Sequence, residues 1–242
     1  MMGLCYCWSL VTLRIFCLIA VTIMNFQAAL LLTLVGIVAS APISDKLDIM
    51  NMSTIGQAHS LINKILEDIS TTHAACINSK RLTLGDSTIW QELEYMRKEL
   101  LKIPSAPVLQ TISSISSMET CLAQIVEGLQ LHLNLLKDVS KATTLAGRMN
   151  GLQADIHHLL SLIKKLQNQA GFDSSKQAQP PVHDLDKHLS DEYKTQVAAH
   201  LILQQLQYFS SDVLSSILSI RSMTEMAENS NTVQLSVNLA AV

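Results

Sequence analysis

The sequence has few aromatic residues, no excess of basic charge and few cysteines, and these shortages narrow the class of protein. Of its 242 residues only 4% are aromatic, whereas 48% are hydrophobic. Leu and Ala favour helices while Val, Tyr and Phe favour sheets, so this composition favours helix-on-helix packing. The formal net charge is −3 and no basic block occurs, which gives no indication of nucleic acid as a partner. The length suits one well-buried domain.

The sequence also lacks the motifs of the common enzyme classes. It contains no Gly-rich phosphate loop, no nucleophile motif and no Cys/His spacing of a metal site. The eight histidines are scattered, and the adjacent His157 and His158 are a poor metal pair because neighbouring helical side chains point apart. We therefore expect a protein that is not an enzyme and uses no cofactor or metal.

Residues 1–41 are predicted to be a signal peptide. Residues 8–41 contain only one charged residue, Arg14, and end in Ala-Ser-Ala, the small-x-small pattern that signal peptidase accepts. Met24 is a possible internal start. A signal anchor is the alternative, because about 18 apolar residues could span a bilayer. Cleavage after Ala41 would release a secreted, extracellular protein that has no membrane contact and begins at Pro42.

Two of the five cysteines, Cys76 and Cys121, remain after the predicted cleavage site, and an even number is typical of a secreted protein. Asn51-Met52-Ser53 is the one N-glycosylation sequon of the mature part, and it lies just before the first expected helix. We expect Asn51 to be a glycosylation site, although such triplets also occur by chance.

Four long segments have apolar residues at steps of three and four, which predicts amphipathic helices. Their expected bounds are about residues 54–76, 117–140, 144–169 and 190–224. Together they would form a four-helix domain over residues 42–226, followed by a flexible polar tail over residues 227–242. A short extra helix is expected over residues 89–102, where Pro104 and Pro107 prevent further helix.

Three local features refine these helices. Ser116 and Glu119 fit a capping box that would begin the second helix. Ser190 is the expected N-cap of the fourth helix. Gly128, in the middle of the second helix, costs about 1 kcal/mol relative to alanine, and close contact with a neighbouring helix would compensate for it. Trp90 is expected to pack on the bundle rather than to bind a ligand.

The lengths of the connections predict the order of the helices. The first and third connections are long and the second is short. A short connection forces antiparallel neighbours, whereas a long one can return along the bundle so that its two helices run parallel. The sequence therefore predicts an all-α, long-chain four-helix bundle with up-up-down-down topology, as in cytokines.

Two motifs accompany this pattern. Residues 101–107 have the sequence Leu-Lys-Ile-Pro-Ser-Ala-Pro, and the second helix contains Cys121, Gly128-Leu129 and Leu136. The first motif resembles the Leu-x-Ile-Pro-x-Ala-Pro segment of granulocyte colony-stimulating factors. The second resembles the Cys-x6-Gly-Leu-x2-aromatic-x3-Leu pattern of the granulocyte colony-stimulating factor and interleukin-6 family, with His132 at the aromatic position.

This resemblance implies a divergent, non-mammalian member of the family. Such a protein would be a secreted growth factor, a monomer when free, that binds and dimerises a class I cytokine receptor. It would drive the proliferation and differentiation of granulocytes and other myeloid cells. An interleukin-6-like cytokine is the alternative within the family. An apolipoprotein-like lipid carrier, which would also present amphipathic helices, is the alternative from another class.

The resemblance also implies receptor contacts. Residues 61–68 resemble the first-helix segment of granulocyte colony-stimulating factor, with Lys64 and Glu67 at its receptor contacts and Asp68 beside them. Residues 152–156 resemble the Leu-Gln-x-Asp-Val of the third helix, which places Asp155 at an acidic contact. A second contact, in the first connection, falls on Glu92 or Glu94.

A disulfide hypothesis follows from the same resemblance. The family carries two short-range disulfides around the first connection, and one cysteine of each is absent here. Cys76 is then expected to pair with Cys121, with two free thiols as the alternative. Closing this loop would stabilise the fold by about 4 kcal/mol.

Overall fold

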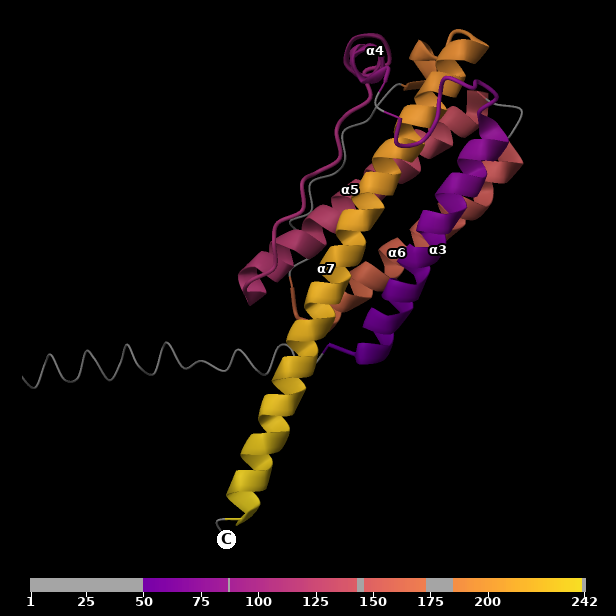
Figure 1. The fold of residues 1–242 in the computed structure, drawn as a ribbon. Coiled ribbons are helices and arrows are strands. Elements are labelled where there is room, and N and C mark those ends of the chain that lie inside the picture. The colour runs from indigo at the N-terminus through magenta and orange to yellow at the C-terminus, as the bar shows by residue number, and fades with distance from the viewer. Residues whose placement is uncertain (1–49, 87, 143–145, 173–184, 241–242) are drawn as a thin grey trace, which may run out of the picture. The chain divides into compact units, whose positions relative to one another are not determined.

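The computed structural model describes residues 50–240 except for residue 87, residues 143–145 and residues 173–184. These residues belong to one unit, Ser44–Val242, and contain helices but no strand. The four long helices are α3 (Met52–Cys76), α5 (Ile115–Ala142), α6 (Ala146–Gln169) and α7 (Glu192–Ala240) (Figure 1). The all-α class is therefore confirmed. The expected signal peptide and the candidate start Met24 lie outside the described residues.

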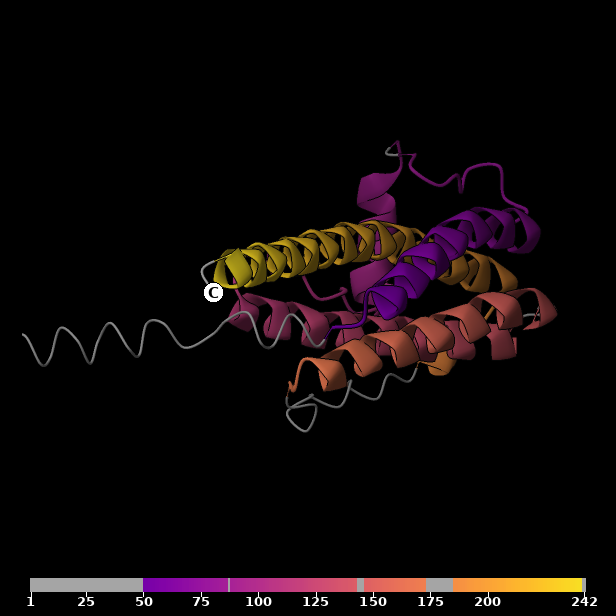
Figure 2. The same ribbon diagram turned by 90° about the horizontal axis from the view of Figure 1, so that it is seen from below.

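Each of the four long helices packs mainly against two of the others. α3 and α5 each pack against both α6 and α7. Figure 2 shows α3 with α7 on one side and α6 on the other. The apolar stripe of each helix faces this shared interior. On α3, for example, Ile62, Ile65 and Ile69 are fully buried.

Contacts between α3 and its neighbours give the relative directions of the helices. The backbone N–H of Asn51 lies 3.5 Å from Oε1 of Gln169, whereas Lys64, further along α3, pairs with Asp155, further back along α6. α3 and α6 are therefore antiparallel. α3 and α7 are antiparallel for the same reason, because His73 meets His200 near one end of both helices and the following Asn78 meets the preceding Gln196.

α5 is also antiparallel to α7. Near the start of α5 the thiol of Cys121 lies 3.5 Å from the hydroxyl of Ser216, and further along α5 the ring of His132 stacks on the preceding Phe209. Because α3 and α5 are both antiparallel to α7, they run in the same direction. α6 likewise runs with α7, as Figure 1 shows.

The connection between α3 and α5 holds two short helical segments in place of the one expected helix. α4 (Trp90–Tyr95) continues into a π-helical turn, η1 (Met96–Leu100). The turn ends because Lys102 has a positive φ of 52°, and the N–H of Ile103 donates to the carbonyl of Arg97. A positive φ is typical of the residue that follows a helix end, but the bond from Ile103 to Arg97 is one residue wider than in a Schellman motif, in keeping with the wider π-helical turn. A 3-10 helix, η3 (Leu185–His188), precedes α7.

The prediction of a capping box at Ser116 and Glu119 was wrong by two residues. Ser114 directly precedes the first residue of α5 and caps it, because its hydroxyl accepts from the N–H of Ser117 at 3.2 Å. The hydroxyl of Ser117 accepts in return from the N–H of Ser114 at 2.9 Å. The box is still reciprocal, but a serine takes the role that glutamate has in the usual motif.

The expected bounds of the fourth helix were also wrong at both ends. Asp191, not Ser190, caps α7, because its Oδ1 accepts from the N–H of Lys194 at 2.8 Å. The helix then continues through the region expected to be a flexible tail and ends at Ala240. The chain has no proline or glycine after Pro181, so no residue type that breaks a helix interrupts it.

The expected role of Gly128 is confirmed. A Cβ atom built there would lie 2.2 Å from Cζ of Phe209 on α7. The glycine thus allows α5 and α7 to approach closely enough for the phenyl ring to lie on the backbone of α5.

The expected disulfide between Cys76 and Cys121 is not present. Both side chains are buried, but they lie at opposite ends of the bundle. Cys76 is one turn beyond His73, which meets His200, whereas Cys121 meets Ser216. These two positions on α7 are separated by about 24 Å of helix, and a disulfide needs Cα atoms within about 7 Å. Two parallel helices necessarily place the end of one far from the start of the next.

Candidate functional site

Four charged residues lie together on the outer side of α3 and α6, two of them exposed and two partly buried. We call this group the α3–α6 cluster, and it consists of Lys64, Glu67 and Asp68 on α3 and Asp155 on α6. The buried stripe of α3 faces the core, which leaves these three α3 residues toward solvent. On α6, Asp155 precedes the fully buried Ile156 and lies at the seam between the helices.

Lys64 links the two helices of the cluster. Its ammonium pairs with Asp68 at 3.1 Å, one turn away on α3, and with Asp155 across the seam. Hydrogen bonds to Asp155 and then to Asp68 raise the pKa of Lys64 above its ordinary value. The Lys64 side chain nevertheless remains 55% exposed, so it can still meet a partner.

Glu67 completes the cluster as an exposed acid. Among the described residues it forms no ion pair, so its carboxylate is open to a partner. The four formal charges of the cluster sum to −2, and the surface is therefore acidic around one cation.

Glu92 lies apart from the cluster. It belongs to α4, is half exposed, and has an oxygen 3.8 Å from Arg81. The structure thus brings together four of the five expected receptor-contact residues, whereas Glu92 belongs to α4, which packs against neither α3 nor α6 to any large extent.

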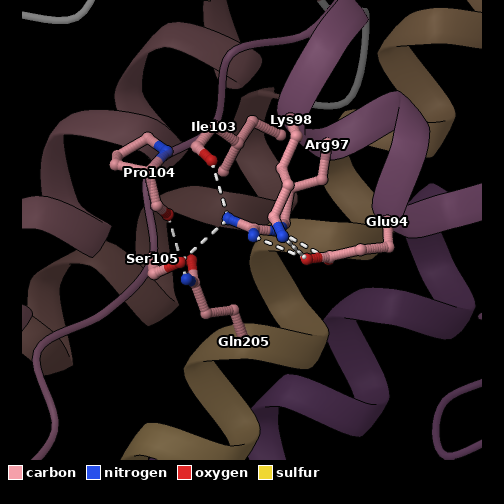
Figure 3. Close-up of polar contacts among 7 residues, drawn as sticks. All are labelled: Glu94, Arg97, Lys98, Ile103, Pro104, Ser105 and Gln205. Carbon is pink, nitrogen blue, oxygen red and sulfur yellow. Dashed lines mark hydrogen bonds and ion pairs between the residues drawn. The ribbon is translucent and has the colours of Figure 1, made fainter.

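Glu94, the alternative to Glu92, belongs to a closed network around Arg97 that we call the Arg97 clamp (Figure 3). Arg97 donates to both carboxylate oxygens of Glu94, at 2.8 and 2.9 Å, and to the carbonyl of Ile103 and the hydroxyl of Ser105. Lys98 pairs with Glu94 at 2.9 Å. Arg97 first, and then Lys98, lower the pKa of Glu94 to about 2.

The Arg97 clamp holds the proline-containing motif of residues 101–107 in place. On the other side of this segment, the amide of Gln205 on α7 donates to the carbonyl of Pro104 at 3.0 Å. The motif that carries the family resemblance therefore has a structural role here, because it ties α4 to α7. Glu94 is fully engaged in that role, which leaves Glu92 as the more accessible acid of the first connection.

Trp90 was expected to pack on the bundle, and no position was predicted for Tyr208. Trp90 is 49% exposed and, with Tyr208, lines a groove of about 190 Å³ between α4 and α7. The expectation that Trp90 packs on the bundle was therefore only half right. Tyr208 lies next to the buried Phe209, outside the apolar stripe of α7, so helical periodicity could have placed it outside the core.

Three buried histidines were also missed. Nε2 of His73 lies 2.9 Å from Nδ1 of His200 between α3 and α7. On α5, Nδ1 of His132 lies 2.7 Å from the carbonyl of Gly128, and its ring stacks on Phe209. Burial lowers the pKa of all three, to about 4 for His132 and His200. The burial of His132 could have been predicted, because it occupies the aromatic position of the second-helix motif.

The remaining expected residues lie as follows. Asn51 is exposed and is the N-cap of α3, because its side chain accepts from the N–H of Ser53 at 2.8 Å. Its glycosylation stays a prediction. His157 and His158 are both exposed, and the described residues contain no group of three or more His, Cys, Asp or Glu that could hold a metal.

No helix in the described part of the chain is both long and apolar enough to cross a membrane. Comparison with protein-family models gives no match for this sequence. Comparison with curated proteins likewise gives no significant match.

Proposed function

We propose that the protein is a secreted cytokine of the granulocyte colony-stimulating factor type. It would bind a class I cytokine receptor through the α3–α6 cluster and, by bringing receptor chains together, drive the proliferation and differentiation of myeloid cells. One observation carries this proposal. Two sequence motifs about 90 residues apart were each singled out by resemblance, and their charged residues meet at the Lys64–Asp155 pair.

The directions of the long helices support the proposal. α3 and α5 run one way, α6 and α7 run the other, and every main contact joins antiparallel helices. That is the up-up-down-down arrangement of cytokine bundles. The long first connection, which contains α4, is needed because it must return along the bundle before α5 begins.

The charge of the cluster supports a protein partner with a basic patch. Exposed charges at the rim of an interface guide the approach of the partner and fix its orientation more than they add affinity. Glu67 and Lys64 therefore act mainly on the rate of association and on the choice of receptor.

The closed interior favours this proposal over a lipid carrier. The apolar stripes of the four helices are buried against each other rather than presented on one face. A packed bundle unfolds cooperatively, whereas a lipid carrier with loosely associated helices melts over a broad range. Thermal melting followed by circular dichroism separates the two functions.

Receptor binding is the direct test. The protein is purified from cells that express all 242 residues and is passed over immobilised ectodomains of class I cytokine receptors from a non-mammalian vertebrate. The set includes the granulocyte colony-stimulating factor receptor and the receptor chains for interleukin-6-like cytokines. We expect capture by the first. Capture only by the receptor chains for interleukin-6-like cytokines would mean that the protein is an interleukin-6-like cytokine. Capture by none of the receptors would refute the proposal.

A further inference from the structure

Asp155 is the least exposed carboxylate of those that hold Lys64. Its side chain is 19% exposed, whereas those of Lys64 and Asp68 are 55% and 39% exposed. Its Oδ2 accepts a hydrogen bond from Nζ of Lys64. A protein that docks on the α3–α6 cluster therefore reaches the Lys64 ammonium more readily than it reaches Asp155.

The Lys64 side chain loses less conformational freedom on binding a partner if other residues of the protein already hold it in place. A free lysine samples many rotamers and loses that freedom when a partner immobilises it. Here Asp68 holds the ammonium from within α3 and Asp155 holds it from α6. Part of the ordering thus occurs during folding, before any partner binds, and such preorganisation favours binding.

We infer that Asp155 is a positioning residue, which holds the Lys64 ammonium at the seam between α3 and α6, and that Lys64 and Glu67 make the contact with the receptor. This inference rests on the proposed function. It differs from the direct acidic contact that the resemblance implies for Asp155.

The first test needs no receptor. The purified protein is treated with an amine-reactive reagent, and mass spectrometry follows the labelling of each lysine. Only the neutral amine reacts, and Asp155 favours the charged form of Lys64. Asp155→Asn should therefore increase the labelling rate of Lys64 a few-fold and leave that of the exposed Lys164 unchanged.

A matched control comes from α5, where Asp138 is 15% exposed and pairs with Lys141 at 2.9 Å. Asp138→Asn should increase the labelling of Lys141 and leave Lys64 unchanged. An unchanged labelling rate of Lys64 in Asp155→Asn would overturn the positioning role.

The second test uses the granulocyte colony-stimulating factor receptor ectodomain and measures association rates for a double-mutant cycle at about 0.5 M NaCl, where long-range steering by the net charge of the cluster is screened. Lys64→Ala and Asp155→Asn should each slow association several-fold. If Asp155 acts through Lys64, then Asp155→Asn has no further effect in the Lys64→Ala background. Effects that multiply in the double variant would overturn the inference, because Asp155 would then contact the receptor itself. Failure of the unaltered protein to bind would refute the proposed function, while the labelling result would still decide whether Asp155 holds Lys64.

Discussion

The α3–α6 cluster and the Arg97 clamp contain the same kinds of charged groups but differ in what those groups have left to bind. The Arg97 side chain is 13% exposed, and its hydrogen bonds go to Glu94 and to the segment that follows η1. The Lys64 side chain is 55% exposed, and its partners are two carboxylates at the surface. A planar guanidinium can join several acceptors in fixed directions, whereas an ammonium is a point charge on a flexible stem.

The Arg97 clamp therefore has a structural role, whereas the α3–α6 cluster is available to bind a partner. The hydrogen bonds of the clamp lie within the molecule, where they hold α4 and residues 101–107 against α7. The cluster joins two rigid helices and keeps exposed charge. Charged residues of this helical bundle can therefore form a binding surface only where the tertiary structure leaves them accessible. It does not leave Glu94 accessible.

Lowering the pH should produce the largest change in the free energy of unfolding. As the pH falls, the loss due to the buried His132 should begin at a higher pH than the loss due to the Arg97 clamp. His132 has a pKa of about 4 in the folded protein and about 6.5 when unfolded, so below pH 6.5 the unfolded chain binds more protons. The free energy of unfolding should fall by about 3 kcal/mol from His132 alone between pH 6.5 and pH 4. The contribution of Glu94, whose pKa is lowered from 4.5 to about 2, is lost only below pH 4.5.

Urea unfolding at pH 7, 5.5 and 4 measures this prediction. His132→Phe keeps an aromatic ring on Phe209 and should make the pH dependence shallower. His157→Gln, at an exposed position, is the control and should not. A free energy of unfolding that is constant from pH 7 to pH 4 would contradict the assignment of a neutral buried His132.

Removal of the clamp should give the next largest effect. Arg97→Ala leaves the carbonyl of Ile103 without its donor and Glu94 without its main partner, and we expect a loss of about 2 kcal/mol in the free energy of unfolding. Arg97→Lys should recover little, because an ammonium cannot reproduce the forked hydrogen bonds. Arg221→Ala breaks an exposed pair with Glu225 on α7 and is the matched control, with a much smaller loss expected.

Substitutions in the α3–α6 cluster should reduce receptor binding rather than stability. Glu67→Ala should weaken receptor binding about tenfold and leave the melting temperature unchanged, because Glu67 makes no ion pair in the described part of the chain. Surface plasmon resonance and thermal melting are measured on the same samples, with Glu127→Ala on the exposed face of α5 as control. Equal loss of binding and of stability would mean that Glu67 is structural.

The smallest effect should be the influence of salt on stability. The ion pairs of Lys64 are exposed, so raising NaCl from about 0.05 M to about 0.5 M should screen them with little change in melting temperature, yet should slow association with the receptor. A large fall in melting temperature with salt, abolished by Lys64→Ala, would show that the cluster stabilises the fold instead.

Much of the fold could be predicted because helix formation is governed by nearby residues. The steps of three and four between apolar residues located all four long helices, and Gly128 correctly indicated a close approach. The helix starts were less predictable, since several serines and aspartates near each start can serve as caps. In the structure the side chains of Ser114 and Asp191, rather than those of Ser116 and Ser190, accept from the first-turn N–H groups.

Contacts between distant segments were harder to predict. A helical stripe shows which face is buried but not which helix covers it, so the facing rings of His73 and His200 could not be anticipated. The disulfide hypothesis failed for the same reason: Cys76 and Cys121 were paired by elimination within a family pattern, while the parallel α3 and α5 place them at opposite ends.

The sequence by itself determined that the chain is all-α, that it contains four long helices, and which charged residues stay off their apolar stripes, because each of these depends on residues within a few turns of one another. Only the tertiary structure decided that Lys64 meets Asp155, that Arg97 encloses Glu94, and that three histidines are buried without an acidic partner among the described residues. Those outcomes depend on how helices distant in sequence pack side by side, and local periodicity carries no information about that packing.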